Sequence, residues 1–136
     1  MSQAMERPGR QDRRLWLRLQ RAATETMERL QQRLPAELRA RARAIPVTFE
    51  PYPSQAMIED GLDPDLLGLF VGDDYTDLET GVTDLPPQII LFLQSLWDYV
   101  EHRPDDFRDE VRRTYLHELG HYLGLDEGEL ETRDLE

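Results

Sequence analysis

Residues 111–127 read VRRTYLHELGHYLGLDE and contain the pattern H-E-x-x-H-x-x-G-x-x-E. His117 and His121 are four residues apart, so on an α-helix they share a face, with their Cβ atoms roughly 6 Å apart. Two imidazoles at that spacing can bind one zinc ion at about 2.0–2.1 Å per nitrogen. Glu118 follows His117 directly and lies beside the metal rather than among its ligands, which suits a carboxylate that acts on a zinc-bound water. The pattern therefore predicts a metal centre carried by a helix.

Gly124 and Glu127 extend the pattern beyond the second histidine. In a straight helix Glu127 would lie about 9 Å farther along the axis than His121, at 1.5 Å per residue. Glycine readily adopts the left-handed conformation that ends a helix and reverses the chain. A turn at Gly124 would therefore bring Glu127 to the metal as a third ligand.

Few residues are available to replace Glu127, because only nine follow it. We expect no downstream helix to donate a carboxylate. The candidates for the third ligand, in addition to any upstream residue, are Glu127, Asp126, Glu129 and Glu131. Spacing favours Glu127, with Asp126 second. The competing interpretation is a fortuitous HExxH on a solvated helix, but these are two of only three histidines in the chain.

The chain has 136 residues, which is a typical length for a single domain. It has no cysteine, so a metal site must use nitrogen and oxygen ligands. The N-terminal stretch MSQAMERPGRQDRR is polar, and no apolar run is long enough to span a bilayer. We expect a cytoplasmic protein that does not interact with membranes.

The net charge of −12 is unevenly distributed along the chain. Residues 1–44 contain eleven arginines and five acids, whereas residues 45–136 contain five arginines and twenty-three acids. A nucleic-acid partner is therefore not expected for the main body. We expect the basic N-terminal segment to pack near its own acidic domain rather than to bind a polyanion.

Apolar residues recur at helical spacing in the N-terminal third, between residues 11 and 34. This stripe comprises Leu15, Trp16, Leu19, Ala22, Ala23, Met27, Leu30 and Leu34. It predicts a core-facing helix, with a partner-binding face as the alternative. A second helix is expected to end near Ala44, and residues 1–10 are expected to form a disordered tail.

Three short apolar runs predict strands at residues 45–50, 66–71 and 88–93. The last, QIILFL, is nearly all apolar and is therefore expected to be central in the sheet. Short helices are expected at residues 54–59 and 95–101. A final helix is expected to begin near Pro104 and to run to about Leu123, with acids in its first turn. This order predicts an α+β fold in which the metal-binding helix packs on a small sheet.

LLGLFVG (66–72), QIILFL (88–93) and VRRTYLHELGHYLGL (111–125), with the acids that follow, resemble the zincin-like minimal metallopeptidases, which are small bacterial proteins. The resemblance covers roughly residues 34–131. It implies a minimal zincin-like fold with a mixed sheet of three to four strands on an active-site helix. Together with the pattern of the rest of the chain, this predicts one domain, residues 1–136, made of the tail (1–10), N-terminal helices (11–44) and a zincin-like core (45–136). In that family the position of Glu127 is commonly an acid that looks like the third zinc ligand. Two positions depart from the family pattern: Leu93 follows Phe92 where a basic residue is frequent, and Tyr122 replaces a common histidine.

The leading hypothesis is a zinc-dependent peptidase in which His117, His121 and Glu127 bind Zn²⁺ and Glu118 is the general base. A peptide or protein substrate could add to the exposed edge of the strand at residues 66–72. The alternative is a noncatalytic protein in which zinc stabilises the fold or an interface. A third possibility is an interaction protein without a metal, built on the N-terminal helix.

No residue stands out in the sequence as a transition-state stabiliser. The side chains that could serve are His102, Tyr75, Tyr99 and Tyr115, each of which we expect to be structural or solvated. The acidic loop at residues 73–84 could favour basic or neutral substrates, although such loops are usually only solvated.

Overall fold

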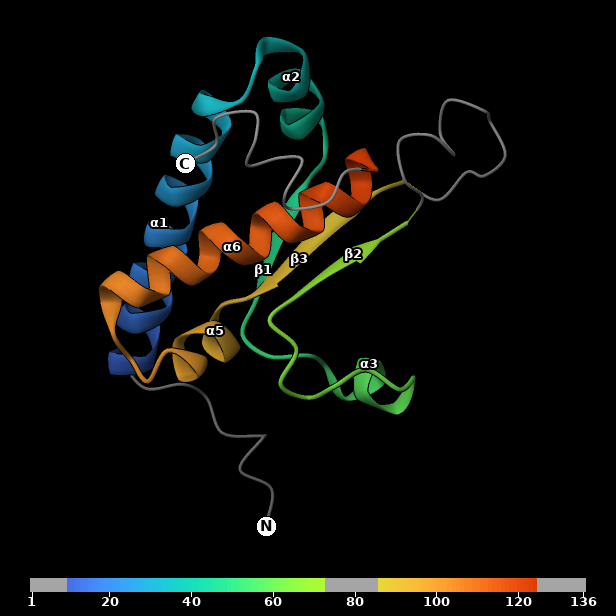
Figure 1. The fold of residues 1–136 in the computed structure, drawn as a ribbon. Coiled ribbons are helices and arrows are strands. Elements are labelled where there is room, and N and C mark those ends of the chain that lie inside the picture. The colour runs from blue at the N-terminus through green and yellow to red at the C-terminus, as the bar shows by residue number, and fades with distance from the viewer. Residues whose placement is uncertain (1–9, 73–85, 125–136) are drawn as a thin grey trace.

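The computed structural model describes residues 10–72 and 86–124 (Figure 1). The expected disordered tail falls on residues outside this part of the chain, apart from Arg10, which begins the first helix. The acidic loop at 73–84 also lies outside the described residues. No described helix is both long enough and apolar enough to cross a membrane.

Two helices form the N-terminal part, α1 (Arg10–Arg33) and α2 (Ala36–Ala44). Pro35 lies between them, where its ring ends α1 and precedes the first turn of α2. The predicted apolar stripe of α1 faces the core. Its members Leu19, Ala23, Leu30 and Leu34 are buried, and Leu15, Trp16, Ala22 and Met27 pack against the core cluster.

The sheet has three described strands, β1 (Val47–Glu50), β2 (Gly68–Val71) and β3 (Gln88–Phe92), in the order β1-β3-β2. β1 is parallel to β3, whereas β2 is antiparallel to it. β3 is therefore central, as its apolar sequence predicted. The mixed α+β fold is confirmed.

The first two strands begin two residues later than their apolar runs suggested. Pro46 has no amide hydrogen and contributes only its carbonyl, which accepts from Ile89 N at 3.0 Å. Leu66 donates to the Asp63 carbonyl at 3.2 Å in a turn. Local turn geometry thus shortens β1 and β2, although their hydrophobic residues continue upstream.

Three further helices complete the described fold. α3 (Gln55–Glu59) begins at Ser54, whose hydroxyl accepts from the Met57 amide at 3.2 Å. α5 (Leu93–Tyr99) follows β3 directly, so it starts two residues before its predicted position. α6 (Pro104–Leu123) has the predicted limits.

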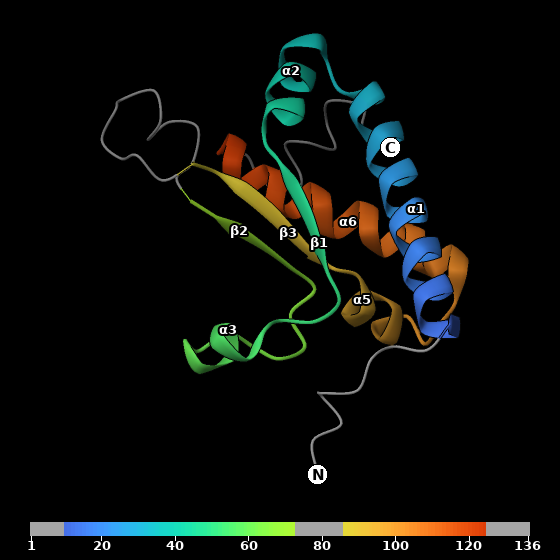
Figure 2. The ribbon, with the colours of Figure 1, turned by 180° about the vertical axis from the view of Figure 1, so that it is seen from behind.

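α6 crosses one face of the sheet, as the two opposite views show (Figures 1 and 2). In the view from behind, the strands lie in front of α6, and α1 runs beside the N-terminal half of α6 (Figure 2). The buried core joins these layers through Ile89 and Leu91 of β3 and Val111, Tyr115 and Leu119 of α6. This packing holds the C-terminal half of α6 over β2.

Candidate metal centre

The sequence at each end of α6 explains why the helix has these limits. Pro104 occupies its first turn, where the missing amide has no helical partner, and Asp105 and Asp106 favour the positive helix N-terminus. At the other end Gly124 has φ 70° and ψ 26°, which is the left-handed conformation. The predicted end of the helix at a left-handed Gly124 is therefore confirmed, whereas the path of the chain toward Glu127 lies outside the described residues.

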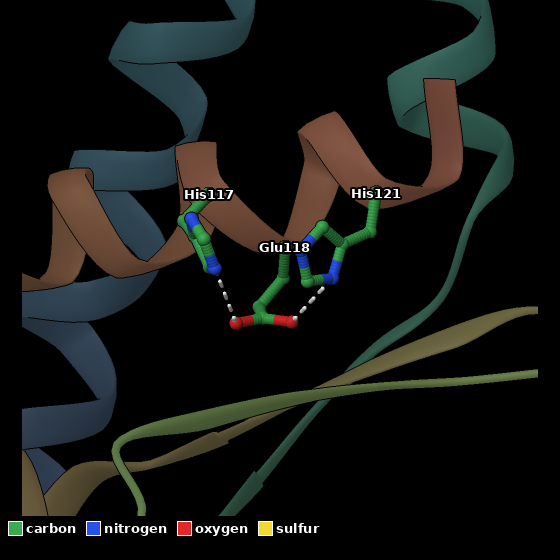
Figure 3. Close-up of side chains that lie close together, drawn as sticks. All are labelled: His117, Glu118 and His121. Carbon is green, nitrogen blue, oxygen red and sulfur yellow. Dashed lines mark ion pairs between the residues drawn. The ribbon is translucent and has the colours of Figure 1, made fainter. Parts of the chain in front are cut away.

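His117, Glu118 and His121 project from one side of α6 toward the sheet and gather beneath the helix (Figure 3). The centroids of the two imidazole rings are 4.6 Å apart. Glu118 Oε2 lies 4.0 Å from His117 Nε2, and Glu118 Oε1 lies 3.5 Å from His121 Nδ1. The i, i+4 spacing thus brings two nitrogen donors to the same carboxylate.

Burial distinguishes the carboxylate from the imidazoles. The side chain of Glu118 is 10% exposed, whereas those of His117 and His121 are 50% and 53% exposed. Burial raises the pKa of Glu118 above its ordinary value, while His121, His117 and a hydrogen bond from the Phe70 backbone oppose that shift. A carboxyl group whose pKa is raised toward the working pH is suited to general acid–base chemistry.

The three side chains fit a divalent metal by their chemistry. Each offers one ligand atom, and these atoms all lie within 4.8 Å of one another. Two imidazole nitrogens with a carboxylate oxygen form a nitrogen and oxygen donor set of the kind that zinc accepts. The expected third ligand, Glu127, and its alternatives at positions 126, 129 and 131 lie outside the described residues.

β2 lies beside this group and is the outer strand of the sheet formed by the described residues. The Phe92 amide donates to the Leu67 carbonyl at 3.0 Å, which makes these two residues a hydrogen-bonded antiparallel pair. Hydrogen-bonded and non-hydrogen-bonded pairs alternate along an antiparallel ladder. Gly68 and Phe70 lie in non-hydrogen-bonded pairs, so their backbone N–H and C=O groups face away from β3. One outward group, the Phe70 amide, donates to Glu118. The candidate base is therefore anchored to the edge strand.

Gly68 allows α6 to approach β2 closely enough for that contact. A Cβ atom at position 68 would lie 2.6 Å from Thr114 Cγ2 and 3.4 Å from Glu118 Cγ. Carbon atoms pack at about 3.5–4.0 Å, so a side chain at this position would push the helix away. The absence of a side chain at position 68 therefore helps to set the depth of Glu118.

A model of the zincin-like metallopeptidase family matches residues 42–136. This segment is more than half of the chain, and it includes β1, β2, β3 and α6. The protein belongs to this family. A search of the curated proteins found no match. Membership of the family implies a metal, and the group of His117, Glu118 and His121 can hold one.

This zincin-like protein has a cleft of about 830 Å³ on the His117 side of the candidate metal centre. His117, Glu118 and Thr114 of α6 line it together with Gly68 of β2. Ser95 of α5 and its neighbours form another part of the wall. The cleft therefore extends from the outer strand β2 to α5.

The three described residues among those considered as transition-state stabilisers have separate surroundings. Tyr115 is fully buried, and its hydroxyl accepts from Gln31 Nε2 of α1 at 2.9 Å, which favours the structural interpretation. His102 stacks on Trp97, with ring centroids 5.0 Å apart. Tyr99 is exposed and lines the cleft. Tyr75 lies outside the described residues.

Three residues that line the cleft were not predicted from the sequence: Tyr52, Ser95 and Asp98. The Tyr52 hydroxyl donates to Asp98 Oδ2 at 2.7 Å across 46 positions of sequence. Asp98 Oδ1 is 2.9 Å from His102 Nε2. Only the i, i+3 spacing of Ser95 and Asp98 was visible in the sequence as a common helix face, and that spacing did not indicate a cleft.

Proposed function

We propose that this protein is a zinc-dependent peptidase. The observation that carries the proposal is that His117, His121 and the buried Glu118 meet directly beneath α6 and beside the open edge of β2. Family membership supports the same conclusion. His117, His121 and Glu127 are the proposed zinc ligands, and Glu118 is the proposed general base.

Zinc, when bound by these ligands, lowers the pKa of a coordinated water and polarises a carbonyl group. Glu118 would accept the proton of the attacking water at its carboxylate and pass it to the departing amine. The Phe70 amide would hold the carboxylate in place, because it donates to Glu118 from a neighbouring strand. Burial beneath α6 would limit the access of bulk water to that proton.

The substrate would bind as an extended peptide along β2. The outward backbone groups of Gly68 and the outward carbonyl of Phe70 can form hydrogen bonds with an added strand. This edge leads into the cleft, so side chains of the same peptide could enter it. β2 lies within the segment that the sequence analysis selected for strand addition.

The test measures bound zinc and peptide hydrolysis for the wild type, Glu118→Gln and His121→Ala. We expect one zinc per chain in the wild type and in Glu118→Gln, and hydrolysis slower by roughly 10²–10⁴-fold in Glu118→Gln because proton transfer is lost. Zinc retained without hydrolysis of any peptide in a diverse library would support the noncatalytic alternative. Full zinc binding by His121→Ala would refute the assigned site.

A matched pair of variants tests the third ligand. Glu127→Gln should weaken zinc binding strongly, whereas Asp126→Asn removes the same charge next to it and should bind zinc nearly as the wild type does. The reverse result would assign the ligand to Asp126. Competition with a chromogenic chelator measures both affinities.

A further inference from the structure

The part of the cleft formed by α5 has a chemistry different from that of the metal centre. Ser95, Asp98 and Tyr99 all line it, and their i, i+3, i+4 spacing places them on one face of the helix. Tyr52 lines the same part of the cleft, and its hydroxyl donates a hydrogen bond to Asp98. α5 lies below the N-terminal half of α6, away from Gly124 (Figure 1). We call Tyr52, Ser95, Asp98 and Tyr99 the α5 subsite.

Ser95 carries a buried polar atom without a partner. The residue is 6% exposed, and its Oγ has no hydrogen-bond partner among the described residues. Buried hydroxyl groups are nearly always hydrogen-bonded, because leaving one unpaired is unfavourable. Ser95 lines the cleft on the helix face that also carries Asp98 and Tyr99, and its Oγ lies just beneath the cleft surface. A polar group of a ligand in the cleft would supply the missing partner.

The charge of the cleft favours a cation. Within the described ranges, the acidic lining residues outside the metal centre are Asp63, Asp65, Asp98 and Glu110, and Arg113 is the only lysine or arginine in the lining. Arg113 is already engaged by Glu110 at 2.7 Å. Among the described residues, Asp98 is bonded to the Tyr52 hydroxyl and to His102 Nε2, and neither partner is an arginine or a lysine. Asp98 therefore offers a carboxylate that is not neutralised by arginine or lysine.

Two exposed tyrosines complete the α5 subsite. Tyr52 and Tyr99 are 48% and 63% exposed, although aromatic side chains of this size are usually more buried. The face of a tyrosine ring attracts a cation, and arginine stacks on aromatic rings more often than lysine does. A carboxylate, an unpaired hydroxyl and aromatic faces together match a planar guanidinium with several hydrogen-bond donors.

We propose that the α5 subsite binds an arginine side chain of the peptide whose backbone lies along β2. This inference names the substrate class and rests on the proposed peptidase function. Asp98 accepts hydrogen bonds from the guanidinium, Ser95 Oγ accepts another, and Tyr52 or Tyr99 covers its face. Lysine, with a single ammonium group, is the weaker ligand at this position.

Binding is tested without cleavage by using zinc-loaded Glu118→Gln and a set of blocked hexapeptides. Each peptide carries one arginine, scanned over the six positions, and each has a partner with citrulline, which keeps the shape of the side chain but removes its charge. We expect calorimetry to show arginine bound roughly tenfold more tightly than citrulline at one position, as one charged hydrogen bond provides. Equal affinity at every position, or no measurable binding of any peptide, overturns the inference.

Three further substitutions, each made in the Glu118→Gln protein, test where the arginine side chain binds. Asp98→Asn should abolish the preference for arginine, and Ser95→Ala should reduce it while the thermal midpoint stays equal or rises, because a buried unpaired hydroxyl is removed. Asp109→Asn removes the same charge as Asp98→Asn, but from α6 and outside the cleft lining, and should leave the preference unchanged. An arginine preference that survives in Asp98→Asn refutes the assignment to the α5 subsite.

Hydrolysis by the wild type separates this inference from the proposed function. Cleavage of the peptide set with equal rates for arginine and citrulline would refute the subsite but leave the peptidase intact. Arginine-selective binding without cleavage by the zinc-loaded wild type would refute the peptidase but leave the subsite as a binding site. Cleavage that is faster for the arginine peptide at the position found by calorimetry supports both.

Discussion

Tyr52 illustrates how the neighbours of a single residue set its protonation. Partial burial, the hydrogen bond to Asp98 and the negative charge of Asp98 together raise the pKa of Tyr52 to about 12. The phenol therefore stays protonated and donates its hydrogen to Asp98 Oδ2. Neither residue shows this pairing in its local sequence.

Titration of Tyr52 provides a prediction at this scale. The difference in tyrosinate absorbance between the wild type and Tyr52→Phe should rise near pH 12, two units above the ordinary value of 10. Because the pKa is raised in the folded protein, the stabilisation from this group is complete below about pH 10 and is lost as the pH rises through 12. Asp98→Asn should lower the midpoint of the difference titration. A midpoint near 10 in the wild type would contradict the bond to Asp98.

The packing of α6 on β2 shows how one element positions another. Thr114 and Glu118 lie one turn apart on α6 and both contact the space above Gly68. The same helix carries His117 and His121 on its adjacent surface, so any displacement of α6 from β2 moves the whole candidate site. Glu118 is the residue most affected because the Phe70 amide holds it from β2.

Substitution at Gly68 tests this close approach. Gly68→Ala should destabilise the protein by about 1–3 kcal/mol, because the new methyl group overlaps Thr114 Cγ2 and the core is overpacked. Thr114→Ser removes that methyl group, so the double variant should recover part of the loss. Urea unfolding of the wild type, both single variants and the double variant gives the coupling energy. If the changes in unfolding free energy of the two single variants simply add in the double variant, the methyl group at position 68 does not clash with Thr114.

The end of α6 permits a second test at the scale of the element. A Cβ atom at Gly124 would meet nothing within 4 Å, so the cost of a side chain there comes only from the positive φ. Gly124→Ala should therefore lower the free energy of unfolding by about 1 kcal/mol, and Gly124→Asn by less, since asparagine tolerates this conformation. The unfolding curves should be measured with a chelator present, so that metal binding does not contribute. Equal stability of the three proteins would show that the left-handed turn is not required.

In the molecule as a whole, α1 belongs to the same core as α6, which carries the candidate metal centre, although α1 precedes the segment matched by the family model. Leu19, Ala23 and Leu30 of α1 are buried in one cluster with Val111 and Leu119 of α6. The ion pair between Arg108 and Glu25, at 3.3 Å, also joins the two helices, but both side chains are substantially exposed and the pair contributes little. The coupling between the N-terminal helix and the site is therefore mainly hydrophobic.

A pair of leucines on α1 tests that coupling. Leu30→Ala should destabilise the protein by about 2–5 kcal/mol, because Leu30 is 3% exposed and its removal leaves a cavity. Leu17 is 61% exposed on the same helix, so Leu17→Ala should change stability by less than about 0.5 kcal/mol. Thermal and urea unfolding measure both variants. Similar effects of the two substitutions would contradict the burial of the α1 stripe against α6.

The sequence predicted the long helices better than the short elements. α6 has Pro104 and two acids at its start and Gly124 at its end, so both limits were visible in local residues. The run from Ile89 to Leu93 is apolar throughout, and hydrophobicity alone does not indicate that β3 ends at Phe92 and α5 begins at Leu93. That boundary depends on backbone contacts with a distant segment, because the amides of Gln94 and Ser95 both donate to the Pro51 carbonyl.

The meeting of His117, Glu118 and His121 follows from residues close together in the chain, because the period of the α-helix alone brings such side chains to one side. The depth of Glu118, its bond to Phe70 and the α5 subsite depend on segments that are far apart in the sequence. The contact of Tyr52 with Asp98 and the closeness of Gly68 to Thr114 arise only when β1, β2, α5 and α6 pack together. Local spacing therefore predicts the metal-binding group, whereas the environment that positions its base and forms the cleft comes from long-range packing, which residue spacing does not record.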